Sequence, residues 1–128
     1  MTLIDTSAWV DFFRNRPSAF AVDMLLANGE AALCGPIVTE IRRGLTAADR
    51  RKVLPLLEGC ETLPQPENLW LEAGDLGFWL SRKGVVVKSL DLLIATYALA
   101  HSVELLSTDT DFVHMQKAGV GLQLFQWN

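Results

Sequence analysis

The sequence predicts an α/β protein in which helices cover both faces of a central parallel sheet, a three-layer α/β/α sandwich. Short apolar runs of strand length alternate with longer stretches of helical periodicity. Several of the short runs are almost continuously apolar, as strands buried on both faces must be. At 128 residues, half of them hydrophobic, the chain has room for one core. We therefore expect a single domain over residues 1–128.

The chain begins with a strand that two helices follow. Residues 2–4 form a short apolar run, which predicts a buried strand. A helix over residues 7–14 ends before Pro17, and a second helix over residues 18–28 is closed by Gly29. The first strand is therefore separated from the next by two helices.

The middle of the chain repeats the alternation. Residues 31–34 predict a strand, and Pro36 stands at a first-turn position of the helix over residues 36–44. A further helix over residues 46–58 contains a proline near its end, and residues 60–63 predict a third strand. These elements extend the expected parallel sheet.

The last part supplies two long helices and the remaining strands. Helical spacing predicts a helix over residues 67–83 and another over residues 89–101, with Ser89 as its N-cap. Residues 103–106 and 122–125 predict strands, and residues 85–87 are a candidate for a brief one.

Two acidic residues come at or just after the carboxyl ends of predicted strands. Asp5 comes after residues 2–4, and Asp109 comes shortly after residues 103–106. In open parallel sheets the functional site lies beyond the carboxyl ends of the strands, so both carboxylates should emerge at one edge. Each aspartate could also be only the N-cap of the helix that follows its strand.

Two more acidic residues lie on apolar helix faces. Glu40 shares a helical stripe with Ile37 and Ile41, so it points toward the core or its rim, and pairing with Arg43 is the structural alternative. Asp91 lies in the first turn of a helix that is apolar all round, where it could simply favour the helix dipole. Neither alternative explains why these acids should gather at one edge.

Gathered carboxylates would need a cation. Two unit charges 4 Å apart at an effective dielectric constant near 20 repel by about 4 kcal/mol. Oxygen ligands without cysteine or histidine suit Mg²⁺ or Mn²⁺. A bound cation of this kind can lower the pKa of water and stabilise charge on a phosphoryl group. The acids therefore predict metal-dependent phosphodiester chemistry.

Four segments resemble the motifs of the PIN-domain family, in the family's order and near its spacing. They are LIDTSAW (residues 3–9), PIVTEIRRG (36–44), LDLLIA (90–95) and LSTDTDF (106–112). The likeness covers essentially the whole chain and is greatest to VapC-type toxins. It implies a PIN-like fold and a Mg²⁺- or Mn²⁺-dependent endoribonuclease that acts on RNA. It also implies a VapB-type antitoxin as inhibitor, a homodimer, and cleavage that leaves a 5′-phosphate and a 3′-hydroxyl.

The resemblance also assigns residues. By position, the family's acidic quartet corresponds to Asp5, Glu40, Asp91 and Asp109, the expected catalytic residues and metal ligands. Asp111 matches an additional acid that many members carry, and we treat it as a further metal-site residue. The hydroxyl residues Thr6 and Thr108 stand beside the acids and could hold carboxylates or water molecules.

Two further groups of residues have competing interpretations. Arg42 and Arg43 could contact RNA phosphates or only solvate a helix face. Trp9, Phe12 and Phe13 lie at helical spacing, which core packing commonly explains, but they could also form a groove for an antitoxin helix.

Bulk properties limit the class of protein. A net charge of −4 and a pI near 5.0 argue against a protein that grips nucleic acid by overall positive charge. Cys34 and Cys60 lack metal-ligand spacing and are expected to be free thiols, and His101 and His114 are expected to be structural. Without a membrane-spanning run or a signal-like start, the expected location is the cytoplasm.

Three alternatives to a nuclease remain. A phosphoacceptor receiver domain would need an acidic doublet after its first strand and a lysine after its last, whereas this chain has the single Asp5 and no such lysine. A haloacid-dehalogenase-like phosphatase would carry the Asp109-Thr110-Asp111 motif at its start. A catalytically silent interaction module would have no reason to keep all four acids.

Overall fold

A four-stranded parallel sheet forms the centre of the molecule. The computed structural model describes residues 1–128. The strands are β1 (Thr2–Ile4), β2 (Ala31–Leu33), β3 (Glu61–Thr62) and β4 (Glu104–Leu106), in the order β3-β2-β1-β4. All neighbouring pairs are parallel, so the carboxyl ends of the strands lie at one edge.

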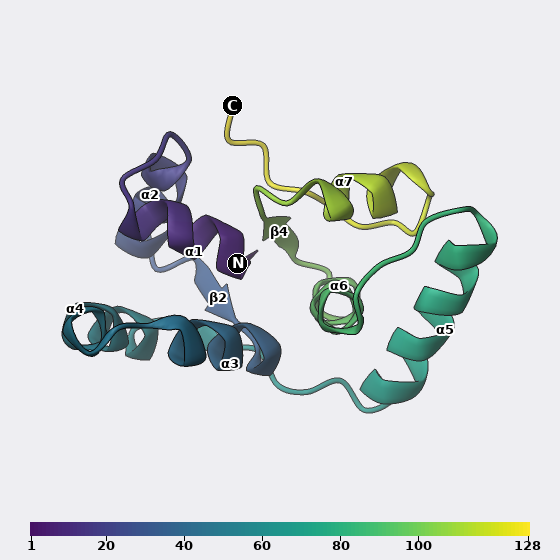
Figure 1. Cartoon of the computed structure of the whole chain (residues 1–128), viewed down its shortest axis with the longest axis horizontal. Coiled ribbons are helices and arrows are strands. Elements are labelled where there is room, and N and C mark those ends of the chain that lie inside the picture. Colours follow the sequence, from purple (N-terminus) through teal and green to yellow (C-terminus); the bar gives the residue numbers. More distant parts are fainter.

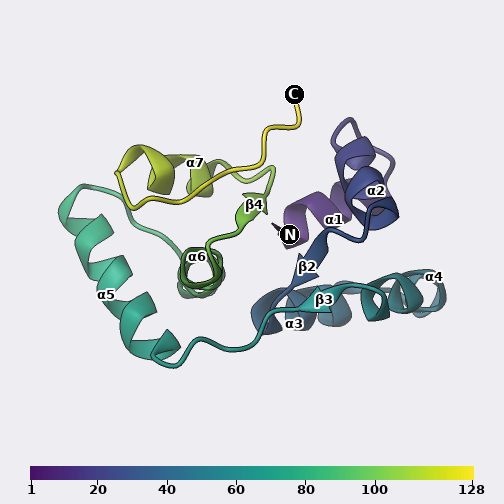
Figure 2. The same cartoon turned by 180° about the vertical axis from the view of Figure 1, so that it is seen from behind.

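Seven helices surround this sheet. They are α1 (Thr6–Phe13), α2 (Ala19–Ala27), α3 (Gly35–Gly44), α4 (Ala47–Glu58), α5 (Leu69–Arg82), α6 (Ser89–His101) and α7 (Thr110–Lys117). Figure 1 shows α1, α2 and α7 on one side of the strands and α3, α4 and α6 on the other. The view from behind in Figure 2 shows the same two layers, with α5 outside α6 at one end of the molecule. The predicted three-layer α/β/α architecture is therefore confirmed.

The core lies between the sheet and these helix layers. It contains 27 buried residues, and every residue of β1 and β2 is buried. Strands covered on both faces must be apolar throughout, which explains the continuous apolar runs in the sequence. Trp9 of α1 and Phe112 of α7 are the largest side chains that are fully buried.

The strand predictions fail in two places. Residues 85–87 lie in the connection from α5 to α6 and form no strand, because no other strand of the protein pairs with them. Residues 122–125 do not form a full strand either. They make a single parallel bridge between Leu105 and Leu124, supported by hydrogen bonds from Leu105 N to Gln123 O and from Phe125 N to Leu105 O.

Most helix positions agree with the predictions, but their ends shift. Ser89 is the first residue of α6 and not its N-cap, a position that Lys88 takes without a side-chain cap. Helix α5 begins two residues later than predicted, at Leu69, and Asn68 precedes it as N-cap. No helix of the structure combines the length and the apolar character needed to cross a lipid bilayer.

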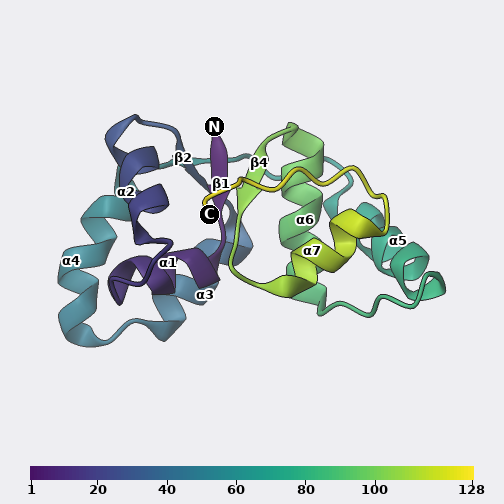
Figure 3. The same ribbon diagram turned by 90° about the horizontal axis from the view of Figure 1, so that it is seen from above.

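The sheet topology positions the site. Seen from above in Figure 3, β1 and β4 lie side by side, and α1 and α7 begin close to the ends of these strands. Ile4 is in register with Leu106, so the residues that follow these two strands leave the sheet next to each other. Asp5 and Ser107 are those residues.

Candidate metal centre

Asp5 is held in place at the carboxyl end of β1. Its side chain is only 5% exposed, and its Oδ2 accepts hydrogen bonds of 2.8 Å from both Ser7 Oγ and Ser107 Oγ. Burial raises the pKa of Asp5, while the two hydroxyl groups act in the opposite direction. Asp5 occupies the N-cap position of α1 but makes no side-chain cap bond, so the interpretation of Asp5 as a simple helix cap fails.

Two serines that the sequence analysis did not single out connect the ends of β1 and β4. Ser7 Oγ lies 3.1 Å from Ser107 Oγ and accepts a bond of 3.0 Å from the backbone N–H of Thr108. Ser107 Oγ accepts a bond of 3.0 Å from the backbone N–H of Asp109. The signal that could have found Ser107 is its place directly after a strand, in register with Asp5.

Three carboxylates converge beside this serine pair. Asp91, Asp109 and Asp111 each offer an oxygen, and these oxygens all lie within 4.8 Å of one another. Asp91 comes from the first turn of α6, whereas Asp109 and Asp111 come from the start of α7. Asp109 accepts a hydrogen bond of 2.9 Å from the backbone N–H of Asp111, so it caps α7 and belongs to the cluster at once.

Asp91 bears the largest electrostatic penalty among these acids. Its pKa is raised from 3.8 to about 6, mostly by burial and in addition by the charges of Asp5 and Asp109, while the charge of Lys88 acts in the opposite direction. Its Oδ2 is buried and has no hydrogen-bond partner. A buried carboxylate oxygen without a partner is costly, and such groups normally pair or coordinate a metal.

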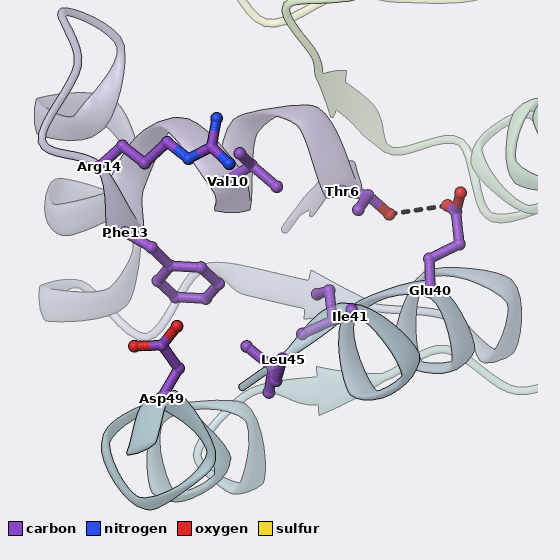
Figure 4. Close-up of a pocket in the computed structure, with 9 residues that line it drawn as sticks. Thr6, Val10, Phe13, Arg14, Glu40, Ile41, Leu45 and Asp49 are labelled. Carbon is purple, nitrogen blue, oxygen red and sulfur yellow. Dashed lines mark hydrogen bonds between the residues drawn. The ribbon is translucent and has the colours of Figure 1, made fainter. Parts of the chain in front are cut away.

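Glu40 lies on α3 at a neighbouring wall of the site, outside the group of three. Its Oε1 accepts a hydrogen bond of 2.7 Å from Thr6 Oγ1, which Figure 4 shows as a dashed line. The pKa of the Cys34 thiol is raised to about 12, mostly by burial and in part by the charges of Asp5 and Glu40. Of the predicted quartet, the structure therefore gathers Asp91 and Asp109, with Asp5 acting on Asp91 through its charge and Glu40 beside Thr6.

The donor set fits a divalent cation. The only salt bridge in the structure joins Arg16 to Asp11, so no lysine or arginine forms a salt bridge with the cluster, and Arg43 does not pair with Glu40. All potential ligand atoms of this cluster are carboxylate oxygens, which are suited to hard cations. Asp91 Oδ2, which is buried and has no hydrogen-bond partner, fits the role of a cation ligand.

Comparison with known proteins agrees with this geometry. The PIN domain matches residues 2–118 of the chain. This chain belongs to the PIN domain family. It is 35% identical over 119 residues to the VapC ribonuclease Mb1587 of Mycobacterium bovis, a match that covers 88% of this chain and 89% of that protein. Ribonuclease VapC11 of Mycobacterium tuberculosis matches with the same identity and the same coverage.

Solved structures share the fold of this PIN domain. The DNA-bound VapBC2 complex of Rickettsia felis superposes with a TM-score of 0.80 at 20% identity, covering 99% of this chain and 98% of that one. DNA-bound VapBC of Salmonella typhimurium gives a TM-score of 0.77 at 16% identity, with coverage of 99% and 98%. Family membership argues against the receiver-domain and dehalogenase-like alternatives.

The aromatic residues of α1 in this PIN domain occupy three different environments. Trp9 is fully buried, so the prediction that it lines a groove is wrong, because its ring fills the core against Phe12 and Phe13. Phe13 lines a hollow of about 250 Å³ between α1, α3 and the start of α4 (Figure 4). Phe12 lines a separate shallow hollow with Phe20.

The remaining predicted residues of the PIN domain lie near the site or support the fold. Arg42 and Arg43 are exposed in the last turn of α3, the helix that carries Glu40. Thr108 contributes its backbone N–H to Ser7. His101 Nε2 donates to the carbonyl oxygen of Pro64 at 2.8 Å, a structural role, whereas His114 is exposed beside Asp111.

Proposed function

We propose that this PIN domain is a divalent-metal-dependent endoribonuclease and the toxin of a toxin–antitoxin pair. One observation carries the proposal: three carboxylates from two helices converge within 4.8 Å, and the oxygen Asp91 Oδ2 is buried without a partner. Relatives at 35% identity bear the name VapC ribonuclease, which supports RNA as the substrate.

The proposed cation site is built from the five acids. Asp91, Asp109 and Asp111 would hold Mg²⁺ or Mn²⁺ directly. When bound, such a cation supplies an activated water for hydrolysis and balances the charge of the scissile phosphate. Asp5 and Glu40 complete the acidic wall, each fixed by hydroxyl groups that restrict its orientation.

The chain's own residues position the reacting groups. Ser7 and Ser107 hold one oxygen of Asp5, so its other oxygen remains available to the site. Thr6 holds Glu40 in the same way. We propose that Arg42 and Arg43, exposed on the same helix as Glu40, contact RNA phosphates and place the substrate across the acids.

The test is cleavage of RNA by the purified protein with mapping of both new ends. We expect cutting that depends on Mg²⁺ or Mn²⁺, is stopped by EDTA, and leaves a 5′-phosphate and a 3′-hydroxyl. Asp5→Asn should abolish cutting, whereas Asp23→Asn, an exposed acid on α2, should not. Expression of the protein without an antitoxin should arrest growth of the host cell. We propose that the toxin acts in the cytoplasm. Equal cutting by the Asp5→Asn variant would contradict the assignment and favour a silent interaction module.

We further propose that a VapB-type antitoxin covers the hollow that Phe13 lines. Val10, Phe13, Ile41 and Leu45 make it apolar in the middle, and Glu40 lies at the end toward the acids. Several structures of the same fold are toxin–antitoxin complexes by their description. Val10→Asp should weaken antitoxin binding and leave RNA cleavage by the free toxin intact, which a pull-down and a cleavage assay would measure side by side.

A further inference from the structure

A further hollow adjoins the acid cluster, between the start of α7 and residues 124–128. Its volume is about 310 Å³, within the range of roughly 300–1,000 Å³ that is typical of small-ligand pockets. Residues 107–110, which join β4 to α7, line one side of it, and residues 124–128 line another. We call it the aromatic hollow. Asp109 belongs both to the acid cluster and to the lining of this hollow, so the two are continuous.

The segment that carries the aromatic side chains of this hollow is held against β4. Leu105 N donates to Gln123 O, and Phe125 N donates to Leu105 O, each at 2.9 Å. After Phe125 the chain runs between α1 and α7 (Figures 1 and 3). Phe125 and Trp127 are half-buried and pack against the edge of the core. The aromatic wall is therefore formed by the fold itself, which lowers the cost of ordering it around a ligand.

The lining of the aromatic hollow combines aromatic rings with neutral polar groups. The amide and hydroxyl side chains around it include Thr110, Gln116, Gln126 and Asn128. Gln116 donates from Nε2 to Leu122 O at 3.3 Å, so its side chain is held in place. Apart from Asp109, no charged side chain lines the hollow. Rings and amides together suit the bases of single-stranded RNA, which stack on aromatic side chains and form hydrogen bonds through their edges.

The charged side chains of α7 line a different hollow. His114 and Lys117 share that hollow with Asp111 and with residues 84–86, which precede α6. A lysine suits an RNA phosphate, which carries no information about sequence, whereas amides and rings suit a base. The acid cluster contributes Asp109 to the aromatic hollow and Asp111 to the charged one. The cluster therefore lies between a surface suited to bases and a surface suited to phosphates.

We propose that the aromatic hollow binds one base of the RNA, that of a nucleotide next to the cleaved bond. Trp127 supplies the surface on which this base stacks, and Gln126 and Asn128 contact its edge. Because Asp109 borders the hollow, a base held there keeps its own phosphate beside the acids. The inference rests on the proposed RNA cleavage and adds to it a determinant of which bond is cut.

The experiment measures RNA binding by proteins that all carry Asp5→Asn, so that the RNA is not cut. Fluorescence anisotropy gives the dissociation constants of hexanucleotides rich in uridine, cytidine, adenosine or guanosine, and of a ribose-phosphate hexamer without bases. At least one of the four should bind about tenfold more tightly than the abasic probe. Trp127→Leu should remove this advantage and leave the affinity for the abasic probe unchanged. Trp127→Phe, which keeps an aromatic face, should preserve most of it.

Two further variants separate stacking from recognition of the base edge. Gln126→Ala should reduce the differences among the four bases but keep their advantage over the abasic probe, because the stacking surface remains. Phe20→Leu, which changes an exposed aromatic residue of α2, is the matched control and should leave every constant unchanged. In proteins that retain Asp5, Trp127→Leu should make cleavage less selective for the bases beside the cut and leave its dependence on Mg²⁺ concentration unchanged.

The outcomes distinguish the base site from the nuclease function. Equal binding of abasic and base-containing probes, or an advantage that Trp127→Leu leaves intact, would overturn the proposal even if the active protein cuts RNA. Absence of RNA cutting, together with a base preference that depends on Trp127, would overturn the proposed nuclease function and still support the base site.

Discussion

Among the residues of the site, Asp91 is the one whose ionised form is most strongly destabilised in the folded protein. Its folded pKa of about 6 exceeds its ordinary value of 3.8 because it is buried and faces other carboxylates. Between these two values the folded state binds more protons than the unfolded state. The free energy of unfolding therefore falls as the pH rises through this window when no divalent cation is present.

The first prediction follows from the raised pKa of Asp91. Asp91→Asn should raise the free energy of unfolding of the cation-free protein at pH 7 by about 1–3 kcal/mol, because it removes the buried charge. It should also flatten the dependence of stability on pH between pH 4 and 6, and it should abolish RNA cleavage. Urea denaturation at several pH values measures both stability effects. Asp23→Asn, on the surface of α2, is the control and should change neither.

The Ser107 hydroxyl connects the residues that follow two neighbouring strands, β1 and β4. It donates to Asp5 at the end of β1 and accepts from the N–H of Asp109 beyond β4. The hydroxyl bond favours the charged form of Asp5 against the effect of burial.

We therefore expect Ser107→Ala to lower both stability and activity. Loss of a part-buried hydrogen bond to a charged group should reduce the free energy of unfolding by about 1–3 kcal/mol. The pKa of Asp5 should rise further, so the acid limb of the pH–rate profile should move to higher pH. Ser81→Ala, whose hydroxyl bonds only to the carbonyl of Phe78 in its own helix, should leave that limb unmoved. An unmoved acid limb in Ser107→Ala would show that Ser107 does not hold Asp5.

Residue identity alone predicted part of this site. The positions of Asp91 and Asp109 at the starts of helices beyond a parallel sheet were enough to predict their convergence, which the structure shows. Ser107 escaped notice because serine after a strand is common in turns and caps, and only the register of β1 with β4 gives it a role. Trp9 was misjudged because helical spacing does not say which of three adjacent aromatic rings points into the core.

At the scale of elements, local patterns located the helices better than the strands. Helix periodicity and turn residues are contained in one segment, so α2, α3 and α6 appear close to their predicted bounds. A strand exists only where a neighbour pairs with it. Residues 85–87 are as apolar as a strand but find no partner, and residues 122–125 form one bridge beside β4.

The packing of α5 on α6 yields the third prediction. Gly77→Ala would bring a methyl group to 2.7 Å from Leu92 Cδ1, so the two helices must shift or Leu92 must change its rotamer. We expect a loss of about 1–3 kcal/mol in the free energy of unfolding and reduced RNA cleavage, because Leu92 neighbours Asp91. Gly74→Ala on the same helix is the control, measured at concentrations where any dimer is dissociated. It should stabilise the protein by up to about 1 kcal/mol. Equal stability of the two variants would contradict the close contact of Gly77 with Leu92.

At the scale of the whole molecule, the acidic site depends on the complete fold. Asp5 follows β1, Glu40 lies on α3, Asp91 begins α6, and Asp109 caps α7, so their meeting requires elements from both ends of the chain. One core of 27 buried residues joins these elements. A ligand that binds only the assembled site must therefore stabilise the entire domain.

The last prediction uses this dependence. Mn²⁺ or Mg²⁺ at about one hundred times its dissociation constant should stabilise the folded protein by about 2.7 kcal/mol, which corresponds to a rise in Tm of roughly 10 °C. EDTA should reverse the shift, and the rise should continue with the logarithm of the cation concentration, as linkage requires. Asp91→Asn should show little of it, although that variant starts from a higher Tm without cation, and Asp23→Asn should respond as the original protein does. Asp91→Asn is thus expected to raise the Tm without cation but to remove the rise in Tm that the cation causes. This result would distinguish a specific cation site from general screening of the negative charge, because screening would shift the Tm of all three proteins alike. A Tm that does not respond to divalent cations would mean that the crowding of Asp91, Asp109 and Asp111 is relieved by protonation, and the proposed metal-dependent cleavage would lose its basis.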